Sequence, residues 1–224
     1  MLEEQALKRE ILAANRRGEP FHFPSGSLLG ARFLGILLEG AVLQQVNLAS
    51  ADLRFASLVA SQLHKVNLSC CRAQESALAR ARLERVDFSR AHFSRAIFKG
   101  ACLEKCRLEG AFFDGAHADG VRIEQSCLER SCWDKAELRG ARLREVTAGA
   151  ASFEEASCRG MLVTAADLRG ADFSQADLRE AAFQDCDLRG AFFQGAWLEQ
   201  TEFQGCRLEG AYLTSLDRKG CRIS

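Results

Sequence analysis

The chain carries a large hydrophobic residue at every fifth position. The pattern is clearest from Ala166 to Leu213, where each fifth residue is Leu or Phe and a small residue, mostly Ala, stands two positions before it. The same phase extends from Ala31 to Ile223 without a break. Between positions 33 and 213 there are 37 such centres, and 30 of them are Leu or Phe.

A period of five fits neither an α-helix nor a continuous β-strand. On a helix, residues five apart would spiral over every face, and on a strand they would point to opposite sides. The pattern keeps one side buried only if the chain turns after each quintet. Within a quintet, the small residue and the centre are two apart, so a short extended segment directs both inward and the residue between them outward. The last two residues form the corner, where Gly is common. Such quintets must stack into a solenoid to bury their apolar side.

The distribution of aromatic centres indicates how many quintets complete one coil. Six of the ten Phe centres fall in one class when positions are sorted in steps of twenty, and Trp133 joins them; these are Phe33, Phe93, Phe113, Phe153, Phe173 and Phe193. This bias predicts a coil of four quintets, or 20 residues, with one side that stacks aromatic rings.

The pattern resembles the pentapeptide repeat family, whose motif is A(D/N)LXX. The resemblance implies an all-β solenoid, a right-handed quadrilateral β-helix. We predict two parts: an N-terminal capping helix and loop over residues 1–27, and a β-helix of about ten coils over residues 28–224. The helix is expected from Leu2 to Asn15, with Leu7, Ile11 and Ala14 on one side, and Gly18 is a plausible stop. Covering the first coil is its expected task, and a free docking helix is the alternative.

The net charge of the whole chain is zero, but the two halves of the chain carry opposite net charges. The chain has 30 basic and 30 acidic residues, so no overall charge directs it to nucleic acid or to a membrane. Residues 1–112 carry a net charge of +5 and residues 113–224 a net charge of −5, counting Lys, Arg, Asp and Glu. The gradient suits head-to-tail association or an oriented partner, or it is simply a solvated surface. No run approaches the roughly 18 apolar residues of a membrane span.

Six of the ten cysteines are expected to be core residues, and the ten are not expected to form a disulfide scaffold. Five of them stand where Ala usually does and one stands at a centre; these are Cys71, Cys106, Cys186, Cys206, Cys221 and Cys158. We therefore expect free thiols and a reducing, cytoplasmic compartment. Cys186 and Cys206 are one coil apart, so oxidation could link them. No metal or cofactor site is expected, since no CxxC pair, phosphate loop or nucleophile elbow occurs.

Two regions depart from the regular repeat. In residues 116–163 the small centres Ala118, Ala148 and Cys158 underfill the core, so either larger neighbours such as Trp133 compensate or cavities soften these coils. At the C-terminal end the last coil has no predicted cover. It either pairs with another copy or a partner, or is solvated through Asp217, Arg218 and Lys219.

Three outward-facing aromatic residues form the main candidate interface. Phe192 and Tyr212 are 20 apart and should stack on one side, with Trp197 on the neighbouring side of the same coil. Aromatic residues are enriched at interface hot spots, although single exposed aromatics are common. Ile97, Phe112 and Leu162 are more isolated outward apolar positions.

Candidate chemistry is sparse. Cys102 should lie between Arg82 and Arg122 in one outward ladder, where the guanidinium groups would favour the thiolate and make a reactive thiol; an inert exposed cysteine is the alternative. His117 and Glu137 should be neighbours and could pair, and a surface hydrogen bond outweighs an acid–base role there. An enzyme is the class that the sequence favours least.

The leading hypothesis is a non-enzymatic interaction or scaffold protein with a protein partner, or a homodimer through the C-terminal coil. Two alternatives come from the family resemblance. Some members mimic double-stranded DNA, bind type II topoisomerases such as gyrase and protect them from quinolones; only the acidic C-terminal half supports that here. Others are adaptors or chaperones of bacterial type VI secretion systems, which the opening LKREILAANRRGEP resembles. Direct nucleic-acid binding by the basic residues 65–107 is disfavoured, because outward aromatics for base stacking are missing.

Overall fold

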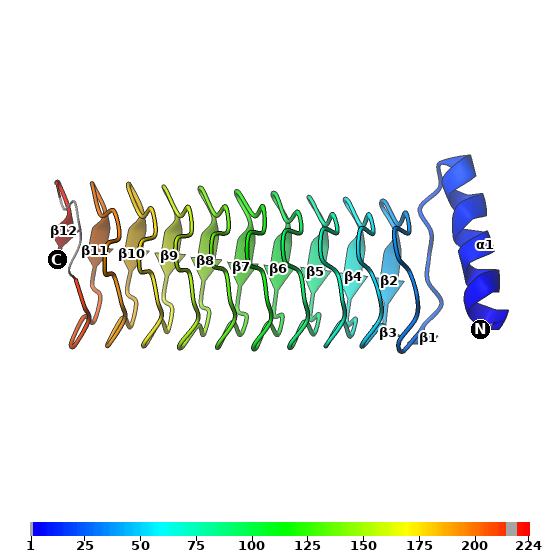
Figure 1. Cartoon of the computed structure of the whole chain (residues 1–224), viewed down its shortest axis with the longest axis horizontal. Coiled ribbons are helices and arrows are strands. Elements are labelled where there is room, and N and C mark those ends of the chain that lie inside the picture. The colour runs from blue at the N-terminus through cyan, green and yellow to red at the C-terminus, as the bar shows by residue number, and fades with distance from the viewer. Residues whose placement is uncertain (1, 214–218) are drawn as a thin grey trace.

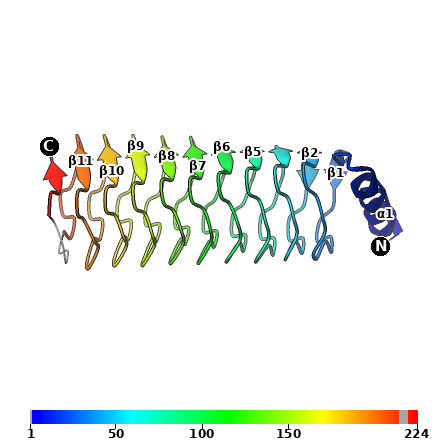
Figure 2. The ribbon, with the colours of Figure 1, turned by 90° about the horizontal axis from the view of Figure 1, so that it is seen from above.

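A computed structural model describes residues 2–213 and 219–224 as one straight rod with a helix at its N-terminal end. The helix, α1 (Leu2–Arg17), lies across the end of a stack of coils, and the chain advances by one coil at a time toward the opposite end (Figures 1 and 2). The predicted residues Asp217 and Arg218 lie outside the described part of the chain. No helix in the described ranges is long and apolar enough to cross a membrane.

Ten short strands form one parallel sheet along the rod. Their order is β12-β11-β10-β9-β8-β7-β6-β5-β4-β2. The strands are β2 (Val42–Gln44), β4 (Gln62–His64), β5 (Arg82–Glu84), β6 (Cys102–Glu104), β7 (Arg122–Glu124), β8 (Arg142–Arg144), β9 (Leu162–Thr164), β10 (Ala182–Gln184), β11 (Glu202–Gln204) and β12 (Arg222–Ile223). A second, two-stranded sheet joins β1 (Gly26–Ser27) to β3 (Val46–Asn47).

Every pairing joins residues 20 apart, which confirms the predicted coil of four quintets. Leu63 pairs with Leu83 in the ten-stranded sheet, and single bridges such as Arg72 to His92 continue the same register on the other sides. We name the four faces by their central residues: face A holds 43 to 223 in steps of twenty, face B holds 28 to 208, face C holds 33 to 213 and face D holds 38 to 198. Face A therefore contains the ten-stranded sheet.

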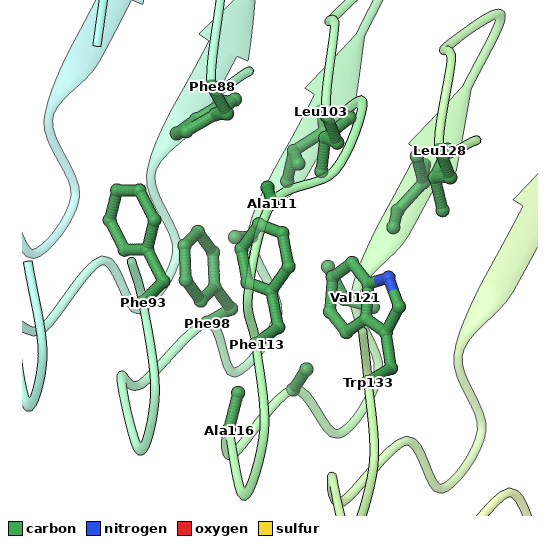
Figure 3. Close-up of a cluster of buried hydrophobic side chains, with 14 of the residues drawn as sticks. Phe88, Phe93, Phe98, Leu103, Ala111, Phe113, Ala116, Val121, Leu128 and Trp133 are labelled. Atoms are coloured by element: carbon green, nitrogen blue, oxygen red, sulfur yellow. The ribbon is translucent and has the colours of Figure 1, made fainter. Parts of the chain in front are cut away.

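The core lies along the rod axis and is built as the pattern predicts. From Leu38 to Phe203 the small residue and the centre of every quintet are buried, and the residue between them, except Asp52, is at least partly exposed. Aromatic rings stack on face C, where Phe93 and Phe113 lie 5.6 Å apart and Phe113 and Trp133 lie 4.1 Å apart, both nearly parallel (Figure 3). Trp133 is 1% exposed, and the small centres Ala118, Ala148 and Cys158 are fully buried in the same part of the rod.

The corners depend on a left-handed backbone at the last residue of each quintet. Positions divisible by five from 30 to 210, and position 220, have φ between +49° and +75°. Glycine suits this conformation, but 23 of these corner residues are not glycine. On face B, the Ala91 N–H donates to the Phe88 carbonyl at 2.9 Å and closes such a corner. The repeated ladder hydrogen bonds outweigh the local cost of each left-handed residue. The sequence pattern alone did not reveal that residues other than glycine adopt this backbone conformation at so many corners.

Phe55 offers a direct test of that cost. It has φ of +59° and its side chain is 55% exposed, so little packing would be lost with it. A left-handed residue with a Cβ costs about 1–2 kcal/mol. Glycine avoids this cost, but its unfolded chain has more conformational entropy to lose, which offsets part of the gain. Phe55→Gly should therefore stabilise the protein by about 1 kcal/mol, measured by urea denaturation. Phe55→Ala keeps the strained corner and is the control, and an equal gain for both variants would contradict the explanation.

The N-terminal helix covers the first coil, as predicted. Leu7, Ile11 and Ala14 are buried, and the Asn15 Nδ2 group donates to the Leu37 carbonyl at 2.8 Å. The segment after the helix is more ordered than the predicted loop. His22 bridges to Val42, and β1 pairs with β3, so ladder pairing begins before position 28. The physical reason is that the exposed backbone groups of the first full coil find hydrogen-bond partners in this segment.

Candidate functional site

The three predicted interface residues lie together on the outer surface of the C-terminal coils. Phe192 and Tyr212 are register neighbours on face C, and their rings stack at 5.1 Å with an interplanar angle of 1°. Trp197 lies on face D of the same coil as Phe192. Phe192 is 37% exposed, Tyr212 is 52% exposed and Trp197 is 44% exposed. We call these residues the aromatic patch.

Backbone ladders hold the aromatic patch in place. The Tyr212 N–H donates to the Ala191 carbonyl and the Trp197 N–H to the Ala176 carbonyl, both at 2.9 Å. Because each of the three residues occupies the middle position of its extended segment, its side chain is directed away from the core. The patch is therefore presented by rigid backbone rather than by a loop.

An arginine completes the patch on face D. The Arg179 guanidinium lies 4.9 Å from the Trp197 ring centre, which is a cation–π contact. Asp177 positions this guanidinium through two hydrogen bonds, from Nε at 2.8 Å and from Nη2 at 2.7 Å. The same hydrogen bonds lower the pKa of the Asp177 carboxyl below its ordinary value. Trp, Tyr and Arg are the residue types that dominate binding hot spots.

Cys102 lies where the sequence predicts. It belongs to β6 and pairs in register with Arg82 of β5 on one side and Arg122 of β7 on the other, and it is partly exposed. The reactivity of this thiol stays a prediction.

Four of the six cysteines expected in the core are fully buried. Cys71, Cys106, Cys158 and Cys186 are buried, whereas Cys206 and Cys221 are half-buried. Burial raises the pKa of the Cys106 thiol to about 12, so it stays protonated at neutral pH. Cys186 and Cys206 are in contact as expected, and hydrogen bonding to Cys206, together with burial, raises the pKa of the Cys186 thiol.

His117 and Glu137 form the predicted surface pair. The His117 Nδ1 and Glu137 Oε2 atoms are 3.0 Å apart, and both side chains are about half exposed. The hydrogen bond from His117 lowers the pKa of the Glu137 carboxyl. Within residues 2–213 and 219–224, no group of three His, Cys, Asp or Glu side chains could hold a metal ion.

A second apolar surface, at the N-terminal end of the rod, was not predicted. A groove of about 410 Å³ lies between α1 and the first coil, and Leu12, Leu34 and Leu37 line it with side chains that are more than half exposed. Lys8 also lines the groove, and its ammonium group lies 5.6 Å from the Phe33 ring centre. The signal was present in the sequence, because Leu34 and Leu37 occupy positions of the quintet that face outward.

Comparison with known families agrees with this architecture. The sequence model of the pentapeptide repeats matches the chain in eight copies, over residues 31–69, 74–110 and 162–195. The chain belongs to the pentapeptide repeat family. No curated protein matches it in sequence.

Several solved structures are similar to the chain. HetL, a pentapeptide repeat protein involved in heterocyst differentiation regulation from the cyanobacterium Nostoc, is 25% identical over 95% of this chain and 93% of its own, with a TM-score of 0.48. QnrB1, a plasmid-mediated fluoroquinolone resistance protein, is 16% identical over 91% of each chain, with a TM-score of 0.49. A pentapeptide repeat protein from the Arabidopsis thaliana thylakoid lumen is 32% identical over 44% of this chain and 65% of its own, with a TM-score of 0.37. All three TM-scores are below 0.5, so these likenesses carry no assignment of function.

Proposed function

We propose that this chain is a non-enzymatic protein–protein interaction or scaffold protein that binds its partner through the aromatic patch. The observation that carries the proposal is the outward stack of Phe192 and Tyr212 beside the Trp197–Arg179 contact. Rings that are preset by the backbone lose little conformational entropy on binding, which favours affinity. A rigid rod also keeps distant surfaces at a fixed spacing, as a scaffold requires.

The DNA-mimic alternative receives less support from the side-chain geometry. A mimic of the phosphate backbone needs rows of free carboxylates. Here three of the carboxylates in the most regular coils are bound by the arginine two residues later: Asp167–Arg169 at 2.6 Å, Asp177–Arg179 at 2.7 Å and Asp187–Arg189 at 2.6 Å. These pairs interrupt the rows of free carboxylates on faces B and D where the repeat motif is nearly ideal. We expect no inhibition of gyrase supercoiling at micromolar protein, and inhibition would favour the mimic instead.

The proposal is tested by affinity capture from a lysate of the native host. The double variant Trp197→Glu plus Tyr212→Glu places two charges in the patch, so proteins retained by the wild type should be lost. Leu29→Glu is the matched control, because Leu29 is 65% exposed on face B and far from the patch along the rod. Capture of the same proteins by all three forms would contradict the proposal.

A further inference from the structure

The exposed apolar side chains are concentrated on one edge of the rod. Eleven large hydrophobic residues in the described part of the chain are exposed. Nine of them lie on faces C and D, at the corner between these faces, or on the helix surface that adjoins them: Leu12, Leu34, Leu37, Phe55, Ile97, Phe112, Phe192, Trp197 and Tyr212. The exceptions are Leu29 on face B and Ile223 on face A. We call faces C and D with their shared corner the CD edge. Apolar surface gathered in this way marks an interaction surface.

The charge gradient of the chain also lies on the CD edge. Faces C and D are built by residues 31–40 and by every second block of ten up to 191–200. In the four blocks up to residue 100 these faces carry six basic and three acidic residues, and in the five blocks from 111 to 200 they carry four basic and ten acidic residues. The net charge therefore changes from +3 to −6 along this edge. Faces A and B are built by the other blocks of ten, from 41–50 to 201–210. Their net charge changes much less, from +2 in the blocks up to residue 100 to −1 in the blocks after it.

The two ends of the CD edge complement each other in shape as well as in charge. The N-terminal end offers the groove of about 410 Å³ lined by Leu12, Leu34 and Leu37. The C-terminal end offers the projecting rings of Phe192, Trp197 and Tyr212. A surface with a groove at the end of its basic half, and rings at the end of its acidic half, is complementary to its own copy turned end for end.

We infer that two copies of this chain pair side by side in antiparallel orientation through the CD edge, so that the aromatic patch of each meets the N-terminal groove of the other. The inference rests on the proposed function, since it names the partner of the same patch as a second copy. A twofold axis makes such an interface self-complementary and closed. Leu37 and Trp197 occupy the same row of face D eight coils apart, and His117 lies halfway between them. The axis then passes near His117, one coil from Ile97.

This axis places opposite charges together at the corner of the CD edge. Arg95 of one copy lies at nearly the height of Asp134 of the other, and the pair occurs twice by symmetry. Like charges also meet at this corner: Asp114 faces its own copy at the axis, and Glu75 of one copy lies at nearly the height of Glu154 and Glu155 of the other. The net charges of the two halves of the edge, +3 and −6, still attract each other, so raised salt should weaken the dimer.

The length of the edge is sufficient for a stable dimer. Coils stack about 4.8 Å apart, so eight coils extend about 38 Å. A standard interface buries about 800 Å² on each partner, which a strip of this length reaches at a width of about 21 Å. Two adjacent faces of the rod provide such a width.

The mass and shape of the purified full chain in solution test the inference. At about 50 µM, within the range expected for an interface of standard area, light scattering after size exclusion should give twice the 24.7-kDa mass of the chain. Small-angle scattering should give a maximum dimension close to that of one rod. A monomer at this concentration, or a dimer of about twice the rod length, would overturn the inference, since the latter is joined end to end.

A charge exchange tests the orientation. Arg95→Asp and Asp134→Arg should each weaken the dimer at least about tenfold in Kd, and the variant with both changes should recover most of the loss because the pair is re-formed in reverse. Arg85→Asp is the matched control, because Arg85 is the corner residue of face A half a coil away. Thermal melting checks that each variant is folded. Independent losses without recovery would overturn the antiparallel arrangement.

The failure of this inference is separable from that of the proposed function. A monomeric wild type whose captured proteins are lost on Trp197→Glu plus Tyr212→Glu refutes the dimer and leaves the scaffold proposal standing. The opposite outcome is a dimer that is weakened by each single charge change and restored by the double change, while the wild type and the Trp197→Glu plus Tyr212→Glu variant capture the same proteins. That outcome refutes a scaffold for other proteins and leaves the dimer standing.

Discussion

Replacing Trp133 by alanine should lower the free energy of unfolding by about 3–5 kcal/mol, the usual cost of removing a large buried aromatic side chain. Trp133 is 1% exposed, stacks on Phe113 at 4.1 Å and donates its Nε1–H to the Ser131 Oγ atom at 3.0 Å. The space would stay open, because ladder hydrogen bonds on all four faces hold the coils at a fixed spacing. Collapse around the missing ring would require those ladders to break.

Urea denaturation followed by circular dichroism measures this loss. Trp197→Ala is the matched control, since Trp197 is 44% exposed and should change the free energy of unfolding much less. The chain has only two tryptophans, so a Trp197→Phe background makes Trp133 the single fluorescent reporter of the central coils. A loss below about 1 kcal/mol for Trp133→Ala would show that the coils do relax, against the expectation for a well-packed core.

Proline should have opposite effects at two positions only two residues apart. The Arg107 N–H donates to the Val86 carbonyl at 3.0 Å in the ladder of face B. Arg107→Pro removes that donor and should cost about 3 kcal/mol or more, because proline in the interior of a sheet also clashes with its neighbours. The natural sequence agrees with this expectation, since its only prolines, Pro20 and Pro24, precede the regular coils.

Glu109 occupies a position that accepts proline. Its φ is not positive, Gly110 after it has φ of +61°, and the Ala111 N–H donates to the Leu108 carbonyl at 3.0 Å. This is the geometry of a type II turn with Glu109 second, where proline is favoured. In the described structure the Glu109 N–H donates no backbone hydrogen bond. Glu109→Pro should therefore be neutral or stabilise by about 0.4–1 kcal/mol.

Thermal melting of the two proline variants decides between them. Both lose the same weak contact between Arg107 and Glu109, whose atoms are 4.0 Å apart, so that contact cannot explain a difference. Equal destabilisation of both variants would contradict the assignment of corner and ladder positions on face B.

Much of the candidate site followed from counting. Once the coil is 20 residues, Phe192 must lie beside Tyr212 and Cys102 must lie between Arg82 and Arg122, because side-chain direction depends only on position within the quintet. The contact between Arg179 and Trp197 was not predicted, because it depends on the rotamer that Asp177 imposes on the arginine. The N-terminal groove was missed because its shape depends on where α1 lies across the first coil.

The sequence by itself determined the quintet, the coil length, the buried positions and the capping helix. It could do so because every contact in a solenoid joins residues at a constant separation, so a local pattern defines the long-range pairing. Only the tertiary structure decided that α1 lies beside faces C and D, where Leu12 joins Leu34 and Leu37 in the groove of the CD edge. The helix is outside the repeat, so no constant separation along the chain defines its contacts, and its position depends on how its apolar side packs on the first coil.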